Sequence, residues 1–253
     1  MHRPRAPIAV AAVAGGMLGA WAEPVAHGVR AAYRPPLHSR PATPPRRHEA
    51  LRQPLFTIVR IPRGSVALRA APGARAVARA GPQTQFGSPT ALAVAARRGR
   101  WLGVESSALP NSKLAWVDGR SPAVAPVRTR VSLHVDLKRL RLTLLDGRRV
   151  LRQAKVGAGS AASPTPTGRF AVTDKLPGGR FSPAYGCCVL ALSGRQSNLP
   201  AGWTGGDRLA IHGTDAPGTI GARASAGCLH AQDRDLKPLM RRVPLGTPVF
   251  IRK

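Results

Sequence analysis

The chain has 253 residues, enough for one large domain or two small domains that each bury a core. Hydrophobic residues make up 43% of it, which excludes a fully disordered chain, and the aromatic content of 4% predicts small cores of valine, leucine and alanine. With 39 lysines and arginines against 11 acidic residues, the formal charge is +28, so the surface should attract polyanions such as nucleic acid or an anionic cell wall.

The first 22 residues have the pattern of a secretory signal peptide. Arg3 and Arg5 precede an apolar run, residues 8–22, that ends in the small-x-small sequence Ala-Trp-Ala. The run is shorter than the roughly 20 residues that a membrane-spanning helix needs, which favours a cleaved signal peptide. An uncleaved N-terminal anchor is the alternative. We therefore expect export to the cell wall or a periplasm-equivalent space, which disfavours nucleic acid as a partner. Residues 23–54, rich in proline and arginine, are expected to form a disordered linker.

A small β-barrel is expected over residues 55–120. Short apolar segments at 56–59, 65–68, 92–94, 101–104 and 114–117 are separated by glycine and proline turns. The stretches 68–73, 99–104 and 115–117 resemble bacterial Src-homology-3-like domains, which implies a module that accompanies wall-active enzymes. Trp101 and Trp116 are expected in its core because aromatic side chains usually fill the interior of small barrels. Residues 121–128 are expected to form a second linker.

A second, mostly β domain is expected over residues 129–253. Strand patterns occur at 131–136, 141–145, 155–157, 170–172, 209–211 and 249–251, and the one helix is expected at 233–240. Asp146-Gly147 predicts a hairpin turn between two of these strands. His134 falls within a strand and is expected to have a structural role.

The chain has three cysteines: Cys187, Cys188 and Cys228. Such an odd, low count argues against a disulfide scaffold. The adjacent pair is expected to pack as small apolar residues, with a bridge between them as the alternative. No Cys-x-x-Cys pair is present, so the sequence favours no metal site. Cys228 is therefore the thiol whose surroundings matter.

Residues with catalytic potential gather around Cys228. The sequence His212-Gly-Thr is followed by Ser225-Ala-Gly-Cys-Leu-His230. A thiol becomes a nucleophile when a nearby base or positive field produces thiolate. Gly227 permits close backbone approach, so its N–H and that of Cys228 are candidates to face a developing oxyanion.

These motifs resemble the L,D-transpeptidase (YkuD-type) catalytic domain, in which His-Gly-Thr precedes Ser-His-Gly-Cys, an apolar residue and Arg or Asn. The stretches 156–157, 165–168 and 246–249 also agree, so the resemblance covers residues 129–253. It implies a β-sandwich-like catalytic fold. It also implies roles for six residues: Cys228 as nucleophile, His212 as base, the Gly213 carbonyl as the group that orients the imidazole, the Gly227 and Cys228 amides as the oxyanion hole, and Ser225 and His230 at the substrate.

The chain departs from this pattern at two positions. Ala226 replaces the second histidine, and His230 replaces the Arg or Asn. Because a histidine is mostly neutral at pH 7, we expect His230 to position substrate carboxylates less firmly than an arginine would.

The resemblance implies an enzyme that cross-links peptidoglycan stem peptides. A thioester on Cys228 would form at the third stem residue with release of terminal D-Ala, no cofactor would be needed, and carbapenems would acylate the same thiol. The basic surface is expected to associate with anionic wall polymers, and the protein is expected to be monomeric. Two alternatives stay open: an L,D-carboxypeptidase that uses water as acceptor, and a wall-binding protein without turnover.

Overall fold

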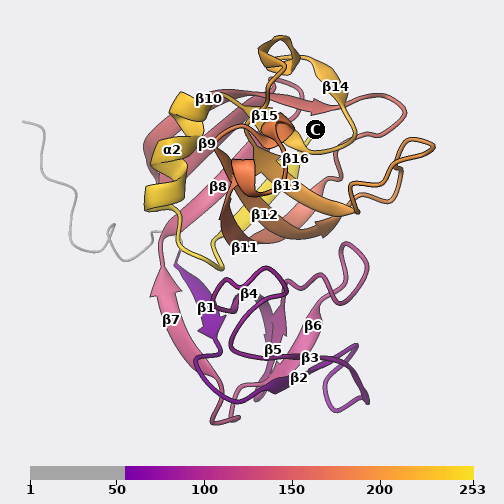
Figure 1. Ribbon diagram of the computed structural model, residues 1–253. Coiled ribbons are helices and arrows are strands. Elements are labelled where there is room, and N and C mark those ends of the chain that lie inside the picture. The colour runs from indigo at the N-terminus through magenta and orange to yellow at the C-terminus, as the bar shows by residue number, and fades with distance from the viewer. Residues whose placement is uncertain (1–54) are drawn as a thin grey trace, which may run out of the picture. The chain divides into compact units, whose positions relative to one another are not determined.

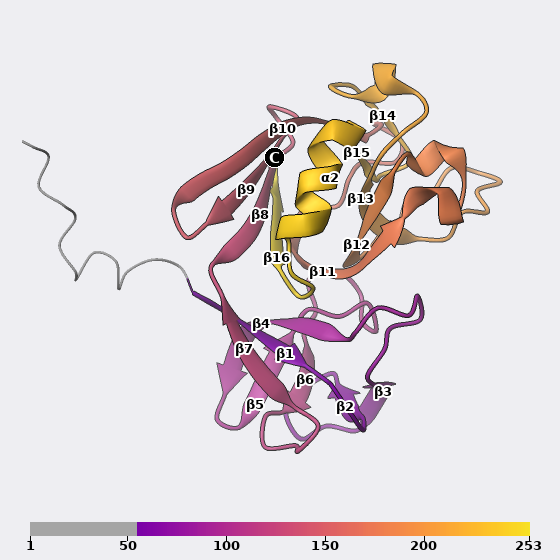
Figure 2. The same ribbon diagram turned by 60° about the vertical axis from the view of Figure 1, so that its left-hand side comes forward.

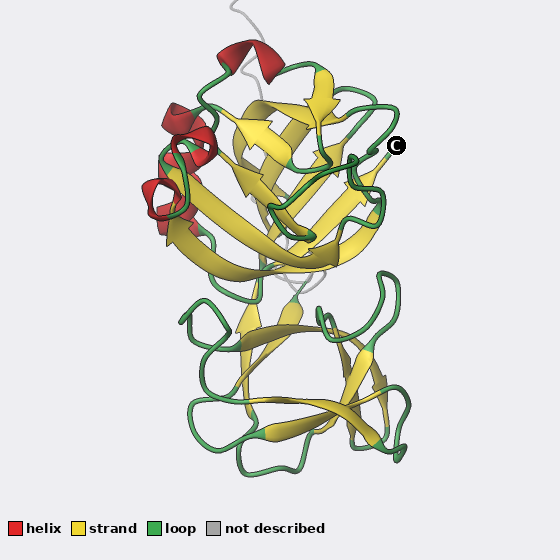
Figure 3. Cartoon of the chain, turned by 45° about the vertical axis from the view of Figure 1, so that its right-hand side comes forward, coloured by secondary structure: helices red, strands yellow, loops and turns green. Residues whose placement is uncertain are grey.

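The computed structural model describes residues 55–253 as two β-sheets with one α-helix and three 3-10 turns (Figure 1). The signal peptide expected at 1–22 and the linker expected at 23–54 lie outside the described residues. Strands are the predominant regular structure of the described chain, and Figure 3 shows the helical turns beside the second sheet. The prediction of a mainly β protein is therefore confirmed.

The first sheet has seven strands in the order β3-β2-β6-β5-β4-β1-β7. Their bounds are β1 Phe56–Arg60, β2 Val66–Arg69, β3 Ala76–Ala80, β4 Ala91–Arg98, β5 Trp101–Val104, β6 Ala115–Asp118 and β7 Ala125–Thr129. Its small core consists of aliphatic residues such as Val59, Val104 and Val117, each fully buried.

The two tryptophans of this sheet differ in their surroundings. Trp116 is buried, with 7% of its surface exposed, as expected. Trp101, at the start of the central strand β5, is only half-buried, and the guanidinium groups of Arg69 and Arg100 lie over its ring at 5.8 and 5.1 Å. The ring of Trp101 is thus covered by cations and does not lie in the core.

The stretch 121–128 is not the linker that was expected. Residues Ala125–Thr129 form β7, which pairs antiparallel with all five residues of β1. Pro126 is tolerated there because β7 is the edge strand of the sheet, where a missing backbone N–H costs no ladder bond.

The second sheet has nine strands in the order β14-β10-β15-β13-β12-β11-β16-β8-β9. Their bounds are β8 Val131–Asp136, β9 Arg141–Asp146, β10 Arg149–Gly159, β11 Gly168–Pro177, β12 Cys188–Arg195, β13 Arg208–His212, β14 Arg223–Ser225, β15 Leu229–Ala231 and β16 Pro248–Arg252. The first half of β10 pairs with β9 and its second half with β15 and β14, so this long strand joins the two ends of the sheet. The sheet therefore curls around its own core.

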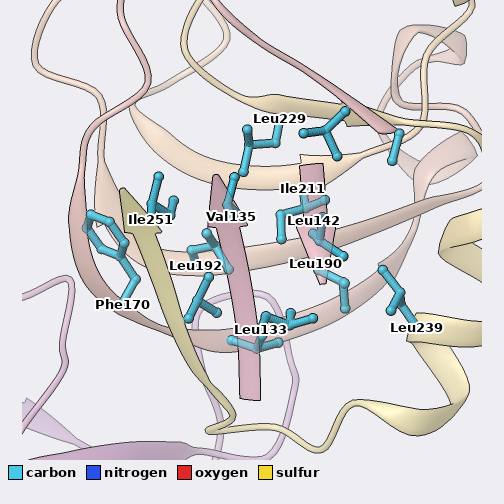
Figure 4. Close-up of a cluster of buried hydrophobic side chains, with 14 of the residues drawn as sticks. Leu133, Val135, Leu142, Phe170, Leu190, Leu192, Ile211, Leu229, Leu239 and Ile251 are labelled. Carbon is cyan, nitrogen blue, oxygen red and sulfur yellow. The ribbon is translucent and has the colours of Figure 1, made fainter. Parts of the chain in front are cut away.

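That core contains the larger hydrophobic cluster of the described chain. Leu133, Leu142, Leu190 and Ile211 are all fully buried, and Figure 4 shows their side chains converging from different strands. Complete burial of a leucine or isoleucine contributes roughly 1.5–3 kcal/mol relative to exposure, so this cluster is the main stabilising feature of the second sheet.

The helix α2, Asp233–Arg242, packs beside β12 (Figure 2). Leu236 and Leu239 face the core and are fully buried, which the three-residue spacing predicts for one helix face. Acidic residues lie in its first turn and basic residues in its last, the arrangement that complements the helix dipole. In the part of the chain from residue 55 onward, no helix has the length and apolar character needed to cross a membrane.

Loops of the first sheet contact the second sheet at named side chains. The Thr84 hydroxyl donates a hydrogen bond to the buried Asp174 carboxylate. Arg169 donates to the Val94 carbonyl at 2.6 Å and lies 3.5 Å from the Glu105 carboxylate. Because Glu105 is buried, its pKa is raised from 4.5 to about 7, a shift that the positive charge of Arg169 opposes.

Candidate active site

The register of two parallel strands brings together the residues singled out by the sequence. β13 pairs with β15 so that Ile211 lies opposite Leu229 and His212 opposite His230. Cys228 directly precedes β15, and its thiol donates a weak hydrogen bond to the Arg208 carbonyl at 3.8 Å. Cys228, His212 and His230 all line one cavity of about 560 Å³.

Alternation along β13 decides which side chains reach this cavity. Leu209 and Ile211 are fully buried in the core, whereas Arg208, Ala210 and His212 point to the opposite face and line the cavity. The strand thus presents a cation, a small residue and an imidazole in a row.

The His212 imidazole is held in one orientation. Its Nδ1–H donates to the Gly213 carbonyl at 2.6 Å, which leaves Nε2 without a proton. The ring centres of Tyr185 and His230 each lie 4.8 Å from that of His212. Burial, reinforced by the neighbouring His230, lowers the pKa of His212 from 6.5 to about 4. The imidazole is therefore neutral at pH 7 and has one nitrogen able to accept a proton.

The Cys228 thiol is also neutral. Burial raises its pKa from 9.0 to about 11, although a hydrogen bond with the Ala210 backbone opposes the shift. The sulfur packs against the small apolar cluster formed by Leu176, Val189, Ala191 and Ala210. Because both groups are neutral at pH 7, the thiol and the imidazole do not form an ion pair, so proton transfer has to accompany the reaction.

The loop before Cys228 is fixed by Ser225. The Ser225 hydroxyl donates to the Cys228 carbonyl at 2.6 Å and accepts from the Gly227 N–H at 3.1 Å. The Gly227 amide, expected to point at an oxyanion, is therefore engaged within the loop. Only the Cys228 amide of the expected pair is without such a local bond, and Ser225, 7% exposed, shapes the loop.

Glycine is required at position 227. Its φ is +119°, and a Cβ there would lie 1.9 Å from Nε2 of Gln196. The Thr165 hydroxyl donates to the Gly227 carbonyl at 2.8 Å and so fixes the turn from the other side.

His230 is held as a neutral donor. The Thr219 hydroxyl donates its one proton to the Ala216 carbonyl at 2.8 Å, so His230 Nδ1–H donates to the Thr219 oxygen, also at 2.8 Å. Burial lowers the pKa of His230, which the Asp215 carboxylate opposes. His230 therefore brings no positive charge to the cavity at pH 7.

Cys187 and Cys188 form a disulfide with each other, so the expectation that they pack as free apolar residues is wrong. The bridge lies next to the histidine segment, because the Gly213 N–H donates to the Cys188 carbonyl at 3.1 Å. The Cys187 N–H donates to the Asp233 carboxylate at 3.0 Å, which ties the same segment to the start of α2. Sequence reasoning had no means to choose between the two states, since adjacency alone allows both.

Several cavity residues were not predicted: Tyr185, Gln196, Trp203 and Arg208. Arg208 could have been found by extending the strand pattern back from His212 in steps of two. Tyr185 ends the three-residue 3-10 turn η2, Pro183–Tyr185, and Trp203 lies in a loop, and both segments are too short or irregular to carry a periodic signal. His134 lies outside this cavity, where its ring stacks on Phe250 at 4.8 Å. Among residues 55–253, no group of three or more His, Cys, Asp or Glu side chains is placed to hold a metal ion.

Comparison with known proteins shows which family the second sheet resembles. The family model of the YkuD L,D-transpeptidase catalytic domain matches residues 130–251. YkuD of Bacillus licheniformis is 33% identical over 134 residues, which cover 52% of this chain and 69% of that protein. YkuD of Bacillus subtilis is 30% identical over 125 residues, 49% of this chain and 65% of that protein. An E. faecium L,D-transpeptidase catalytic domain solved as its ertapenem adduct is 25% identical and covers 49% of this chain and 98% of that one, with a TM-score of 0.35.

The chain belongs to the YkuD family of L,D-transpeptidase catalytic domains. The family match spans the second sheet and α2 and leaves the first sheet outside it. The chain spans about two thirds of the length of the two Bacillus relatives.

Proposed function

We propose that this protein is a cysteine-dependent L,D-transpeptidase that cross-links peptidoglycan stem peptides. The observation that carries the proposal is the cavity that Cys228, His212 and His230 share, with His212 Nε2 free to accept a proton. Family membership supports peptidoglycan stem peptides as the substrate class, and we propose that the residue attacked is the third of the stem, a diamino acid.

The reaction begins with proton transfer from the Cys228 thiol to His212 Nε2. The sulfur attacks the carbonyl carbon of the third stem residue, and the developing oxyanion is stabilised by the Cys228 N–H. The C–N bond to terminal D-Ala then breaks, the amine takes the proton from His212, and a thioester remains on Cys228. A side-chain amine of a second stem attacks the thioester and loses a proton to His212. The new amide C–N bond forms as the C–S bond breaks, and the sulfur takes the proton back from His212 to regenerate the thiol.

The Gly227 amide joins the oxyanion hole only if it exchanges its bond to Ser225 for one to substrate. Because its hydrogen bond to the Ser225 hydroxyl is 3.1 Å long and both groups are neutral, a charged oxygen is the stronger acceptor. We propose that acyl transfer includes this exchange.

The remaining parts of the proposal concern where the enzyme acts. The first sheet is proposed to be a Src-homology-3-like module, and the charge of +28 to hold the protein at anionic wall polymers after export. Removal of the wall polymers' charge, or high salt, should release the protein if this is correct.

The test is mass spectrometry of a purified disaccharide-tetrapeptide incubated with the full chain. Wild type should form a cross-linked dimer and release D-Ala, while Cys228→Ala should form neither. His212→Gln should lose at least about 100-fold in rate, as expected for removal of a general base. His134→Gln is the matched control, since His134 lies outside the cavity, and should keep full activity.

Each other outcome selects a different function. A tripeptide without dimer would identify an L,D-carboxypeptidase. Retained wall binding with no product that depends on Cys228 would identify a wall-binding protein. Intact-mass analysis after treatment with a carbapenem gives an independent readout, because a covalent adduct confined to Cys228 is expected even when no acceptor is present.

A further inference from the structure

We propose that Arg208 forms a carboxylate-binding subsite beside Cys228 and that its ligand is the terminal carboxylate of the donor stem peptide. The choice of ligand rests on the function proposed above, whereas the presence of the subsite does not. Position 230 carries no cation here, so the positive charge that a carboxylate needs has to come from elsewhere in the cavity.

Arg208 is placed to supply that charge. It lines the cavity with Cys228 and His212, on the same face of β13 as His212. Two residues along a strand span about 6.6 Å, so the Cα atoms of Arg208 and His212 lie about 13 Å apart with Ala210 midway. The Cys228 sulfur contacts the Arg208 carbonyl and the Ala210 backbone, and therefore lies over the part of β13 between the Cα atoms of Arg208 and His212.

The Arg208 guanidinium keeps most of its donors free. Its two hydrogen bonds are long, 3.5 Å to the Thr173 hydroxyl and 3.4 Å to the Leu192 carbonyl. None of the ion pairs within residues 55–253 includes Arg208. A guanidinium has five N–H donors arranged to hold a carboxylate with two parallel bonds.

The neighbouring carboxylates do not accept hydrogen bonds from the Arg208 guanidinium. Both oxygens of Asp207 accept from Arg195, at 2.8 and 2.7 Å. Asp174 accepts from the Thr84 hydroxyl, and its second oxygen is buried without a partner. The negative charges of Asp174 and Asp207 favour the protonated guanidinium, which offsets part of the lowering of the Arg208 pKa by burial. Arg208 therefore stays charged while its N–H groups remain available.

Phe86, in the loop between β3 and β4, supports the guanidinium. The Phe86 ring centre lies 5.8 Å from the Arg208 guanidinium carbon and 6.2 Å from the Phe181 ring centre. Stacking on an aromatic face orients a guanidinium without using its N–H donors.

Of the carboxylates of the donor stem peptide, the terminal one is nearest to the carbonyl that Cys228 attacks. One residue of an extended peptide spans about 3.5 Å, so the carboxylate of the expelled terminal residue lies close to the attacked carbonyl. We infer that the donor binds with that carbonyl at Cys228 and its terminal carboxylate toward Arg208, an orientation that leaves the His212 imidazole free to exchange a proton with the leaving amine.

Alkylation of Cys228 tests the subsite without requiring any enzymatic activity. Iodoacetate carries a carboxylate and iodoacetamide a neutral amide of nearly the same shape, and Cys228 is the one free thiol of the described residues. The measured quantity is the alkylation rate with iodoacetate divided by the rate with iodoacetamide, and this quotient is then divided by the same quotient for free cysteine. Because both reagents react with the same thiolate, a change in the thiol pKa affects both rates equally and does not alter the ratio. We expect a ratio of about 10 or more for wild type and about 1 for Arg208→Gln. Arg241→Gln, which removes an exposed cation of α2 outside the cavity, should leave the wild-type ratio.

Turnover with matched donors tests the ligand. Replacing the terminal carboxylate by a carboxamide should lower kcat/KM about 10- to 100-fold for wild type and less than about 3-fold for Arg208→Gln. Arg208→Lys, which keeps the charge but not the fork, should be intermediate. Equal alkylation ratios in wild type and Arg208→Gln would overturn the subsite, and equal turnover of the two donors by wild type would overturn its ligand. A ratio that depends on Arg208 in a protein that turns over neither donor would keep the subsite and reject the transpeptidase.

Discussion

The neutral state of the Cys228–His212 pair predicts a slow thiol in the free protein. The perturbation is pH: with a pKa of about 11 in place of 9.0, the thiolate fraction below pH 9 falls about 100-fold. A more basic thiolate is intrinsically more nucleophilic. With a Brønsted coefficient of about 0.4–0.5, this raises the alkylation rate about 6- to 10-fold and offsets part of the loss in thiolate fraction. Folded Cys228 should therefore react with iodoacetamide about 10-fold more slowly than the same cysteine in the unfolded chain.

The assay is the alkylation rate between pH 6 and 10, followed by intact mass with the disulfide left oxidised. The rate should rise about tenfold per pH unit without a plateau, because a single group with a pKa near 11 controls it. His212→Gln should change this profile by less than about 3-fold, while it lowers the rate of acyl transfer to peptides at least about 100-fold. A plateau at neutral pH that disappears in His212→Gln would refute the reasoning, since it would reveal a preformed thiolate–imidazolium pair.

Three further results are expected. Gly227→Ala should lose about 1–3 kcal/mol of stability and its turnover, because a side chain at φ +119° meets Gln196, while Gly218→Ala, with open space around it, should melt as wild type does. The pKa of Glu105 is about 7 when folded and 4.5 otherwise, so its contribution to stability is complete below pH 4.5 and is lost as the pH rises through 7. The stability of Glu105→Gln relative to wild type should thus increase by up to about 3 kcal/mol as the pH rises from 4 to 8, measured by thermal melts. Melting temperatures of the two proteins that change in parallel with pH would contradict this. Thiol titration of the denatured chain should find one thiol before reduction and three after it, given the Cys187–Cys188 bridge, and three before reduction would contradict the disulfide.

The sequence predicted elements whose residues alternate between core and solvent. The helix at α2 was expected from Leu236 and Leu239, and both are fully buried. Five strands were missed. In the second sheet, β14 and β15 have only three residues each and β12 is buried at seven of its eight residues, so none of them shows an alternating pattern. β3 and β7 are the outer strands of the first sheet, and their residues are partly or fully exposed. Edge strands show little alternation because only one side of the ladder and one face are covered, so composition alone resembled a loop or a linker.

The candidate site was predictable in its residues but not in its hydrogen bonds. His212 and Cys228 line one cavity, as their motifs suggested. The engagement of the Gly227 amide by Ser225 is a short-range side-chain bond, which serine forms readily in turns, yet its presence depends on the loop conformation. Arg208 was missed because the strand was begun one residue too late, at Leu209.

The bridge between Cys187 and Cys188 also protects Cys228 by elimination. A chain with three cysteines can lose a reactive thiol whenever an oxidant couples it to another cysteine of the same molecule. Here the two other sulfurs are bonded to each other, so Cys228 has no second free thiol in the molecule with which an oxidant could couple it. The segment that borders the histidine thus removes two competitors at once, and an odd number of cysteines leaves a single, unambiguous site for covalent chemistry.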